Sequence, residues 1–162
     1  MTDVLKVASY LCQRYKDTYG VQMDEMKLHK LLYFTQREAI IQTGAPMFHE
    51  KFKAWKYGPV LPQIRKHYKD DTLHYTLDKC DVEKYKDVFD KIFEIYAKKK
   101  SWSLSTLTHC EYSWTKARQG CDTDAHCDTD IETDDIRVDA ERMRQRRIML
   151  SIWDKMKKVN TK

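Results

Sequence analysis

The run MDEMKLHKLLYFTQREAIIQTG at residues 23–44 most constrains how this chain can fold. Its apolar residues are Leu28, Leu31, Leu32, Tyr33, Phe34, Ala39, Ile40 and Ile41. On a helix these side chains point in most directions around the axis, and a helix that is apolar on nearly all sides needs neighbours on all sides. We therefore predict a central, buried helix that begins after Asp24, a suitable N-cap, and ends before Gly44 and Pro46.

Three other segments carry apolar residues at the spacing of amphipathic helices. The first spans residues 4–15, with Thr2 or Asp3 as its cap and Gly20 in the turn beyond its end. The second begins near Asp81 and runs to residue 96. The last opens at Thr133, and its predicted buried face is formed by Ile136, Ala140, Met143, Leu150 and Trp153.

The remaining segments predict shorter elements. Short helices are expected at residues 62–68, 103–108 and 114–118, and Thr108 with Glu111 has the spacing of a capping box for the third of them. Residues 52–57 alternate in the manner of a strand, which the Gly58-Pro59 pair ends. Residues 73–77 also alternate and are a candidate partner for that strand.

Length and composition define the fold class. A chain of 162 residues suits one domain, which we place at residues 1–162 with its core at about 4–155. Only 4 Gly and 3 Pro are present, which argues against a sandwich, a barrel or a long linker. The prediction is a mainly α fold, a compact single-domain helical bundle with a small β-hairpin.

The sequence also indicates the compartment. No run approaches the roughly 18 apolar residues that a membrane span needs, and the start does not have the order of a secretory signal. The five cysteines are odd in number and lack regular spacings, which favours reduced thiols. We expect a cytoplasmic protein without membrane contact.

The acidic segment at 120–135, which contains CDTDAHCDTDIETDD at 121–135, is the first candidate for chemistry. Cys121, His126 and Cys127 lie among carboxylates and could take part in a metal- or thiol-dependent enzyme, but their spacing does not match a zinc site. A calcium loop beginning at Asp128 would have Thr133 where glycine is required. A mobile acidic loop without metal is the preferred interpretation, and no cofactor is expected.

Other catalytic patterns are weak. His109, Cys110 and Glu111 are adjacent, and neighbours on a helix point in different directions, so a structural role for Cys110 is favoured over nucleophilic chemistry. The four glycines do not form a phosphate-binding loop. We therefore expect that the protein is not an enzyme.

A basic run on the last helix suggests nucleic acid as an alternative partner. The run contains Arg142, Arg144, Arg146 and Arg147. These arginines could contact the phosphates of a nucleic acid. They lie several ways around the helix beside acids such as Glu141, and the net charge is only +5. Nucleic-acid binding is therefore the less favoured interpretation, and partner docking or plain solvation is preferred.

The stretch AWKYGPV at 54–60 places aromatic and cationic side chains on a turn. Trp55 and Tyr57 beside Lys53 and Lys56 are the kind of groups that anchor protein interfaces. Equally, Trp55 could fill the core and Gly58 could serve only backbone geometry. Residue chemistry alone leaves the two interpretations equal.

Three stretches together resemble the Panacea domain family, the SocA-like antitoxins of bacteria and their phages. They are KLHKLLYFTQREAIIQTGAPMF at 27–48, FKAWKYGPVLPQIRKHY at 52–68 and LSTLTHCEYSWTKAR at 104–118. The matching positions are Lys27, Leu28, Lys30, Leu31, Leu32, Tyr33, Ala54, Trp55, Tyr57, Gly58, Pro59, Val60, Leu107, Thr108, His109 and Trp114. The chain departs from the family pattern at Ser113, where the family commonly has Pro, and in the length of its acidic segment.

The resemblance implies a function as well as a fold. Family members typically bind and neutralise a cognate protein toxin encoded beside them, and at least one acts as an adaptor that delivers its toxin to a ClpXP-type protease. We expect the toxin to bind a surface formed by Lys53, Trp55, Lys56, Tyr57, His109 and Trp114. The alternative is an accessory or regulatory protein of a phage or other mobile element that binds nucleic acid or a host protein.

Overall fold

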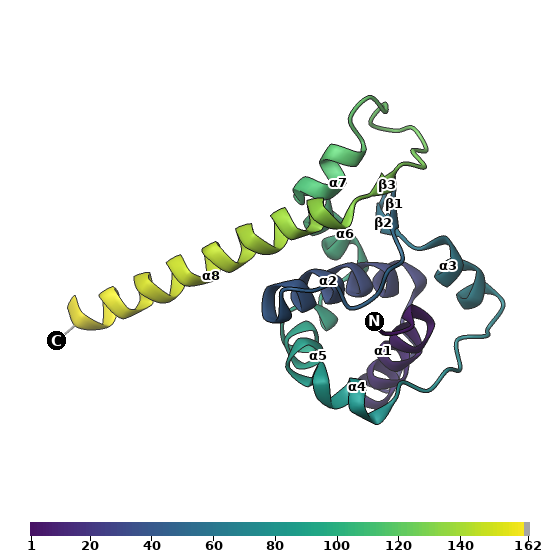
Figure 1. Cartoon of the computed structure of the whole chain (residues 1–162), viewed down its shortest axis with the longest axis horizontal. Coiled ribbons are helices and arrows are strands. Elements are labelled where there is room, and N and C mark those ends of the chain that lie inside the picture. The colour runs from purple at the N-terminus through teal and green to yellow at the C-terminus, as the bar shows by residue number, and fades with distance from the viewer. Residues whose placement is uncertain (161–162) are drawn as a thin grey trace.

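Helix α2 (Glu25–Thr43) lies at the centre of the body of the molecule, as its composition predicts (Figure 1). Every residue from Lys27 to Ile40 is buried. This computed structural model describes residues 1–160, and for Asn160 it describes only the backbone. Helix α2 packs against elements from both ends of the chain. The elements in contact with it include α1, α3, α5, α6, α8 and β2.

The chain is mainly helical, with a small antiparallel sheet. Besides α2, the elements are α1 (Val4–Tyr19), β1 (Phe52–Trp55), β2 (Gly58–Val60), α3 (Pro62–Lys69), α4 (Lys79–Lys84), α5 (Lys86–Ile92), the π-helix η1 (Phe93–Ala97), α6 (Ser101–His109), α7 (Tyr112–Ala117), β3 (Asp130–Ile131) and α8 (Thr133–Asn160). The predicted fold class is thereby confirmed. Among the described residues, no helix has the length and apolar character that crossing a membrane requires.

The predicted helix ends are confirmed for the first two helices. The carboxylates of Asp3 and Asp24 accept hydrogen bonds from the backbone N–H groups of Leu5 and Lys27, which satisfies donors that lack a partner within a helix. Gly20 and Gly44 end the two helices in the left-handed conformation, with φ of 71° and 74°.

The sheet has the strand order β2-β1-β3, with both pairs antiparallel. The expected hairpin of β1 and β2 is present, but the prediction that residues 73–77 form a strand is wrong. The second edge of β1 is instead occupied by β3, with Phe52 opposite Ile131. An edge that is already paired cannot accept another strand, and residues 73–77 lie along the body without ladder hydrogen bonds.

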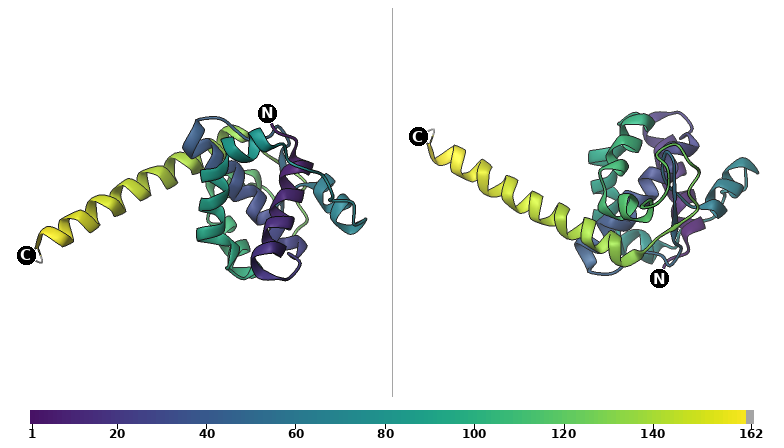
Figure 2. Two further views of the ribbon diagram at one scale, coloured as in Figure 1. Left: turned by 90° about the horizontal axis from the view of Figure 1, so that it is seen from below. Right: turned by 90° about the horizontal axis from the view of Figure 1, so that it is seen from above.

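Helix α8 covers α2 with its first half and then leaves the body (Figure 2). Ile136 and Ala140 are buried as predicted, but Leu150 and Trp153 are 54% and 56% exposed, so the predicted buried face is wrong beyond Met143. Beyond Met143, no other element of the described residues covers these side chains of α8. Arg147 makes a bidentate contact with the buried carboxylate of Glu38, at 2.9 and 2.8 Å, where the helix departs.

Candidate functional site

The three motif stretches meet beneath the turn that joins β1 and β2. Gly58 has φ of 108°, and a Cβ there would lie 2.5 Å from Thr108 Oγ1 and 2.7 Å from Lys30 Cε. The turn therefore rests directly on α2 and α6, and only glycine allows so close an approach. Ser105 strengthens the contact by donating a hydrogen bond from Oγ to the carbonyl oxygen of Tyr57, at 2.7 Å.

Trp114 and His109 support the turn from α7 and α6. The indole Nε1 of Trp114 donates to the carbonyl oxygen of Trp55 at 3.0 Å, and the imidazole of His109 stacks on the Trp114 ring at 4.1 Å. Burial lowers the pKa of His109, which favours the neutral ring. Both residues thus hold the turn in place, and Trp114 is half-buried in this role.

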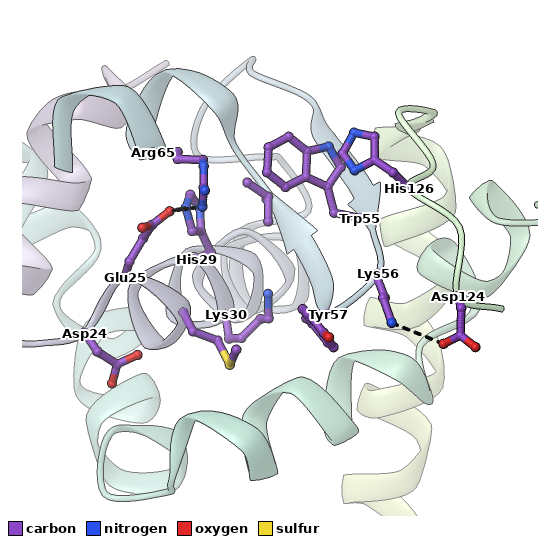
Figure 3. Close-up of a pocket in the computed structure, with 12 residues that line it drawn as sticks. Asp24, Glu25, His29, Lys30, Trp55, Lys56, Tyr57, Arg65, Asp124 and His126 are labelled. Atoms are coloured by element: carbon purple, nitrogen blue, oxygen red, sulfur yellow. Dashed lines mark hydrogen bonds and ion pairs between the residues drawn. The ribbon is translucent and has the colours of Figure 1, made fainter. Parts of the chain in front are cut away.

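A pocket of about 610 Å³ opens between this turn, the start of α2 and helix α3 (Figure 3). This volume lies in the ordinary range for small-molecule sites. It is lined by Asp24, Glu25, Met26, His29, Lys30, Trp55, Lys56, Tyr57, Val60, Arg65, Asp124 and His126. The lining combines aromatic and aliphatic walls with a small number of charged groups.

Lys30 forms part of the floor of the pocket and is 1% exposed. Its Nζ donates one hydrogen bond to the carbonyl oxygen of Pro59 at 3.1 Å, and no carboxylate of the described residues forms an ion pair with it. Burial lowers the pKa of this amine to about 7. A lysine that is buried without an acidic partner is rare, because transferring its charge from water is costly.

His29 lies beside Lys30 and is also buried. Its Nδ1 accepts a hydrogen bond from the backbone N–H of Leu61 at 3.3 Å, so Nε2 carries the proton of the neutral ring. Nε2 is 3.6 Å from Glu25 Oε1 and has no hydrogen-bond partner among the described residues. Glu25 is itself paired with Arg65 at 2.6 Å.

The acidic segment at 120–135, for which the sequence favours a mobile loop, lies folded against the β1–β2 turn. The guanidinium of Arg118 stabilises the fold of the segment by donating hydrogen bonds to the carbonyl oxygens of Asp122, Thr123 and Ala125. It also donates to Ala54 in β1 at 2.9 Å, which ties the segment to the sheet.

The expectation of reduced thiols is wrong for two of the cysteines. Cys121 and Cys127 form a disulfide, because the fold around Arg118 brings their Cα atoms to 6.2 Å. Their sulfurs are therefore not available as thiolate ligands for a metal. In the part of the chain that the structure describes, no group of His, Cys, Asp and Glu side chains is arranged to hold a metal ion.

The two lysines of the predicted partner surface contact the same acidic segment. Lys53 pairs with Asp130 at 2.8 Å, and Lys56 pairs with Asp124 at 3.2 Å. The indole Nε1 of Trp55 donates to Asp128 at 3.0 Å. The interpretation that Trp55 fills the core does not hold, since it lies half-buried in the pocket wall.

Tyr57 is the exposed residue of the AWKYGPV stretch, with 47% of its surface accessible. Its ring meets the edge of Trp102, which is 62% exposed, at a centroid distance of 5.3 Å. Sequence reasoning missed Trp102, although an apolar residue at the start of a polar helical stretch is a usable signal. It also missed Lys30 and His29 as site residues, because their neighbours in the sequence indicate only a buried helix.

The predicted capping box at Thr108 and Glu111 is wrong. Thr108 Oγ1 donates to the carbonyl of Ser105, and the first N–H groups of α7 are instead capped from α8. Asp139 accepts hydrogen bonds from the backbone N–H of Tyr112 at 2.7 Å and of Ser113 at 2.9 Å. A proline at position 113 would lack this N–H donor. The departure from the family pattern at Ser113 therefore allows the hydrogen bond to Asp139.

The four arginines of the alternative nucleic-acid site contact different parts of the protein. Arg147 is paired with Glu38 and Arg144 with Glu141, whereas Arg142 lies 4.9 Å from the centre of the Tyr112 ring. Arg146 lines a smaller hollow beside Glu111. They do not form one cationic face, because two of them already neutralise acids of this chain.

Comparison with known proteins identifies one family. The family described as "Antitoxin SocA-like, Panacea domain" matches residues 28–115, more than half of the chain. Antitoxin SocA from Caulobacter vibrioides (strain NA1000 / CB15N) is 36% identical over 44 residues, which is 27% of this chain and 23% of that protein. The match thus covers about a quarter of that relative's length. No solved structure matches the chain.

Proposed function

Because the chain belongs to the SocA-like Panacea domain family, we propose that it is an antitoxin that binds and neutralises a protein toxin encoded beside it. The family match carries this proposal, since it contains the meeting point of Lys30, Gly58 and Thr108. The relative from Caulobacter vibrioides is named an antitoxin. The action is binding in the cytoplasm, without catalysis.

The toxin binds the face around the β1–β2 turn. Tyr57 and Trp102 supply exposed aromatic area at its centre, which is the type of side chain that contributes most to interface affinity. Trp55, Trp114 and His109 hold the turn rigid, so little conformational freedom is lost on binding.

Lys53 and Lys56 contribute charge to the same face. Their present partners Asp130 and Asp124 are acids of an exposed segment, and exposed ion pairs of this kind contribute only about 0–1 kcal/mol each. Acidic side chains of the toxin can therefore replace them at small cost. The side chains of Asp130 and Asp124 cover the lysines in the free antitoxin and give way to the acidic side chains of the toxin on binding, while the backbone of the segment stays in place.

Co-expression tests the proposal. The open reading frame next to this gene is expressed in a bacterial host with and without the antitoxin, and surviving colonies are counted. We expect Tyr57→Ala and Trp102→Ala to lower survival while leaving the thermal unfolding transition intact. Tyr75→Ala is the matched control, because Tyr75 is 41% exposed on another part of the surface. A toxic neighbour that the wild-type protein does not rescue contradicts the proposal.

The route of neutralisation is tested separately. Direct occlusion leaves the toxin intact in the complex, whereas an adaptor for a ClpXP-type protease shortens its lifetime. The toxin's half-life in hosts with and without that protease distinguishes the two routes. We propose occlusion as the primary route, because it needs only the surface described above.

The alternative, an accessory protein that binds nucleic acid, makes a different prediction. Phosphate contacts through the basic run would give an affinity that falls steeply with salt. Replacing Arg142 and Arg146 by Ala would remove it, and both can be changed without breaking the Arg147–Glu38 pair. Absence of DNA or RNA binding at low salt excludes this function.

A further inference from the structure

The pocket beneath the β1–β2 turn has hydrogen-bond donors at its floor that the protein does not use. His29 Nε2–H has no hydrogen-bond partner among the described residues, although the side chain is 2% exposed. Lys30 Nζ has three possible N–H donors and one acceptor, the carbonyl oxygen of Pro59. Buried donors without acceptors are costly, so a pocket that contains the unpartnered His29 N–H beside an amine with N–H groups to spare is suited to a ligand that brings acceptors.

The nearest acid, Glu25, has Oε1 at 3.6 Å from His29 Nε2, which is beyond hydrogen-bond distance in this arrangement. Glu25 is held by Arg65, and Asp124 by Lys56. Asp24 caps α2 and accepts a second hydrogen bond from Ser101 Oγ at 2.6 Å. Each carboxylate therefore has its own partner, and the groups left over at the floor are the imidazole N–H and the amine.

We propose that this pocket binds a small anion in which a carboxylate or phosphate group is attached to a flat apolar body. The anionic oxygens accept hydrogen bonds from His29 Nε2 and Lys30 Nζ. The flat body lies between the aromatic surfaces of Trp55 and Tyr57, with Met26 and Val60 completing the wall. This is an activity beyond toxin binding and does not rest on the antitoxin function.

The placement of the two donors supports an anion over a neutral ligand. Burial lowers the pKa of Lys30 to about 7, so the amine takes up a proton readily near neutral pH when a negative charge arrives beside it. Arg65 and Lys56 lie at the sides of the pocket, each paired with a carboxylate, so the amine of Lys30 is the cationic group there without an acidic partner among the described residues. A cationic ligand would meet these same groups without a free carboxylate to pair with.

Calorimetry and NMR with phenyl phosphate and benzoate test the proposal on the full chain near pH 6.5. For ligands of this size we expect a Kd of about 1 mM, with amide shifts confined to the pocket lining. Benzyl alcohol and benzylamine, which share the ring but lack the anion, should bind at least about tenfold more weakly.

Three variants define the site. Lys30→Met removes the amine while keeping an unbranched buried side chain, and it should weaken phenyl phosphate binding at least about tenfold. Met26→Trp fills the pocket from the partly exposed start of α2 and should abolish binding even if Lys30→Met fails to fold. Lys69→Met removes the same charge from an exposed position outside the pocket and should leave the affinity unchanged.

Several outcomes overturn the inference. One is no saturable binding of either anion, and another is equal binding of benzyl alcohol. Binding that survives Met26→Trp, or that survives Lys30→Met in a folded protein, also overturns it, because the site would then lie elsewhere. Each result is independent of toxin neutralisation, so failure here leaves the antitoxin proposal standing.

Discussion

Two buried residues, Lys30 and Gly58, are each constrained by their surroundings in the fold. Lys30 is the clearest, since it lies on the central helix with its amine under a tight turn. Such a residue lowers stability while it is charged, because its charge has been transferred out of water without an acidic partner. Gly58 above it is constrained in a different way, by its positive φ and by the two side chains that it touches.

Lys30→Met should change how stability depends on pH. The pKa of this amine falls from 10.5 in the unfolded chain to about 7 in the folded protein, so between these values the unfolded chain binds more protons. The free energy of unfolding therefore rises with pH in this window, by up to about 1.4 kcal/mol per pH unit. Below about pH 7 both states are protonated and the slope vanishes.

Urea unfolding at several pH values between about 7 and 10 measures this slope. The Lys30→Met variant should show a smaller rise than the wild type, whereas Lys69→Met, at an exposed position, should match the wild type. Equal slopes in all three proteins would mean that Lys30 keeps an ordinary pKa.

Gly58→Ala should be much more costly than Gly20→Ala. Both glycines have positive φ, which costs an alanine about 1–2 kcal/mol. A Cβ at Gly20 meets nothing within 4 Å, whereas at Gly58 it lies 2.5 Å from Thr108 Oγ1. We expect Gly58→Ala to lower the free energy of unfolding by at least about 2 kcal/mol more than Gly20→Ala, measured by urea denaturation. Similar losses in both variants would show that the turn can move away from α6.

At the scale of elements, the structure depends on caps and pairings between segments far apart in the sequence. Helix α7 has six residues and no side-chain cap of its own, and α8 supplies the carboxylate of Asp139 to its start. Asp139 also accepts from the hydroxyl of Tyr33 at 3.0 Å, so one side chain joins α2, α7 and α8. The buried Arg37 and the partly buried Glu111 form an ion pair beside it.

Asp139→Ala should therefore loosen three helices at once. It leaves the N–H groups of Tyr112 and Ser113 without their acceptor and removes one of the partners of the Tyr33 hydroxyl, and we expect a loss of about 3 kcal/mol in the free energy of unfolding. Asp139→Asn keeps one acceptor oxygen and should lose less. Asp134→Ala, at an exposed position in the first turn of α8, is the control. An unchanged Tm in Asp139→Ala would show that the cap is dispensable.

The whole molecule consists of a helical body and a projecting helix (Figure 2). The described side chains from Ile148 to Val159 are exposed, and they include Ile148, Met149, Leu150, Ile152, Trp153, Met156 and Val159. The body is completed before them, since the bidentate contact of Arg147 with Glu38 lies at the boundary. The projecting half of α8 thus contributes little to the stability of the fold.

Removing residues 149–162 should leave the body folded. We expect the Tm to change by no more than about 3 °C, because no buried side chain of the described residues is lost. Arg147→Ala, by contrast, leaves the buried carboxylate of Glu38 without its ionic partner and should cost about 2 kcal/mol. Calorimetry of the two variants checks both expectations. A large fall in Tm on truncation would mean that the projecting half folds back onto the body in solution.

Most helices of this chain could be predicted from the sequence because their signals are local. Apolar spacing, the caps at Asp3 and Asp24 and the stops at Gly20 and Gly44 act within a few residues, and all of these predictions are confirmed. The apolar circumference of residues 23–44 also determined that α2 is central. The family motifs identified the turn at Gly58 because the signal for a turn is also local, being specified by adjacent residues.

The tertiary structure alone decided the rest, because those features depend on distant partners. The edge of β1 is paired with β3, and the periodicity of residues 73–77 could not show that the two residues at 130–131 would occupy it instead. The apolar stripe of α8 beyond Met143 predicts burial, yet no body lies beneath it. The pocket exists because α2, α3, the β1–β2 turn and the acidic segment meet there. The unpartnered N–H of His29 and the amine of Lys30 without an acidic partner are visible only after that assembly.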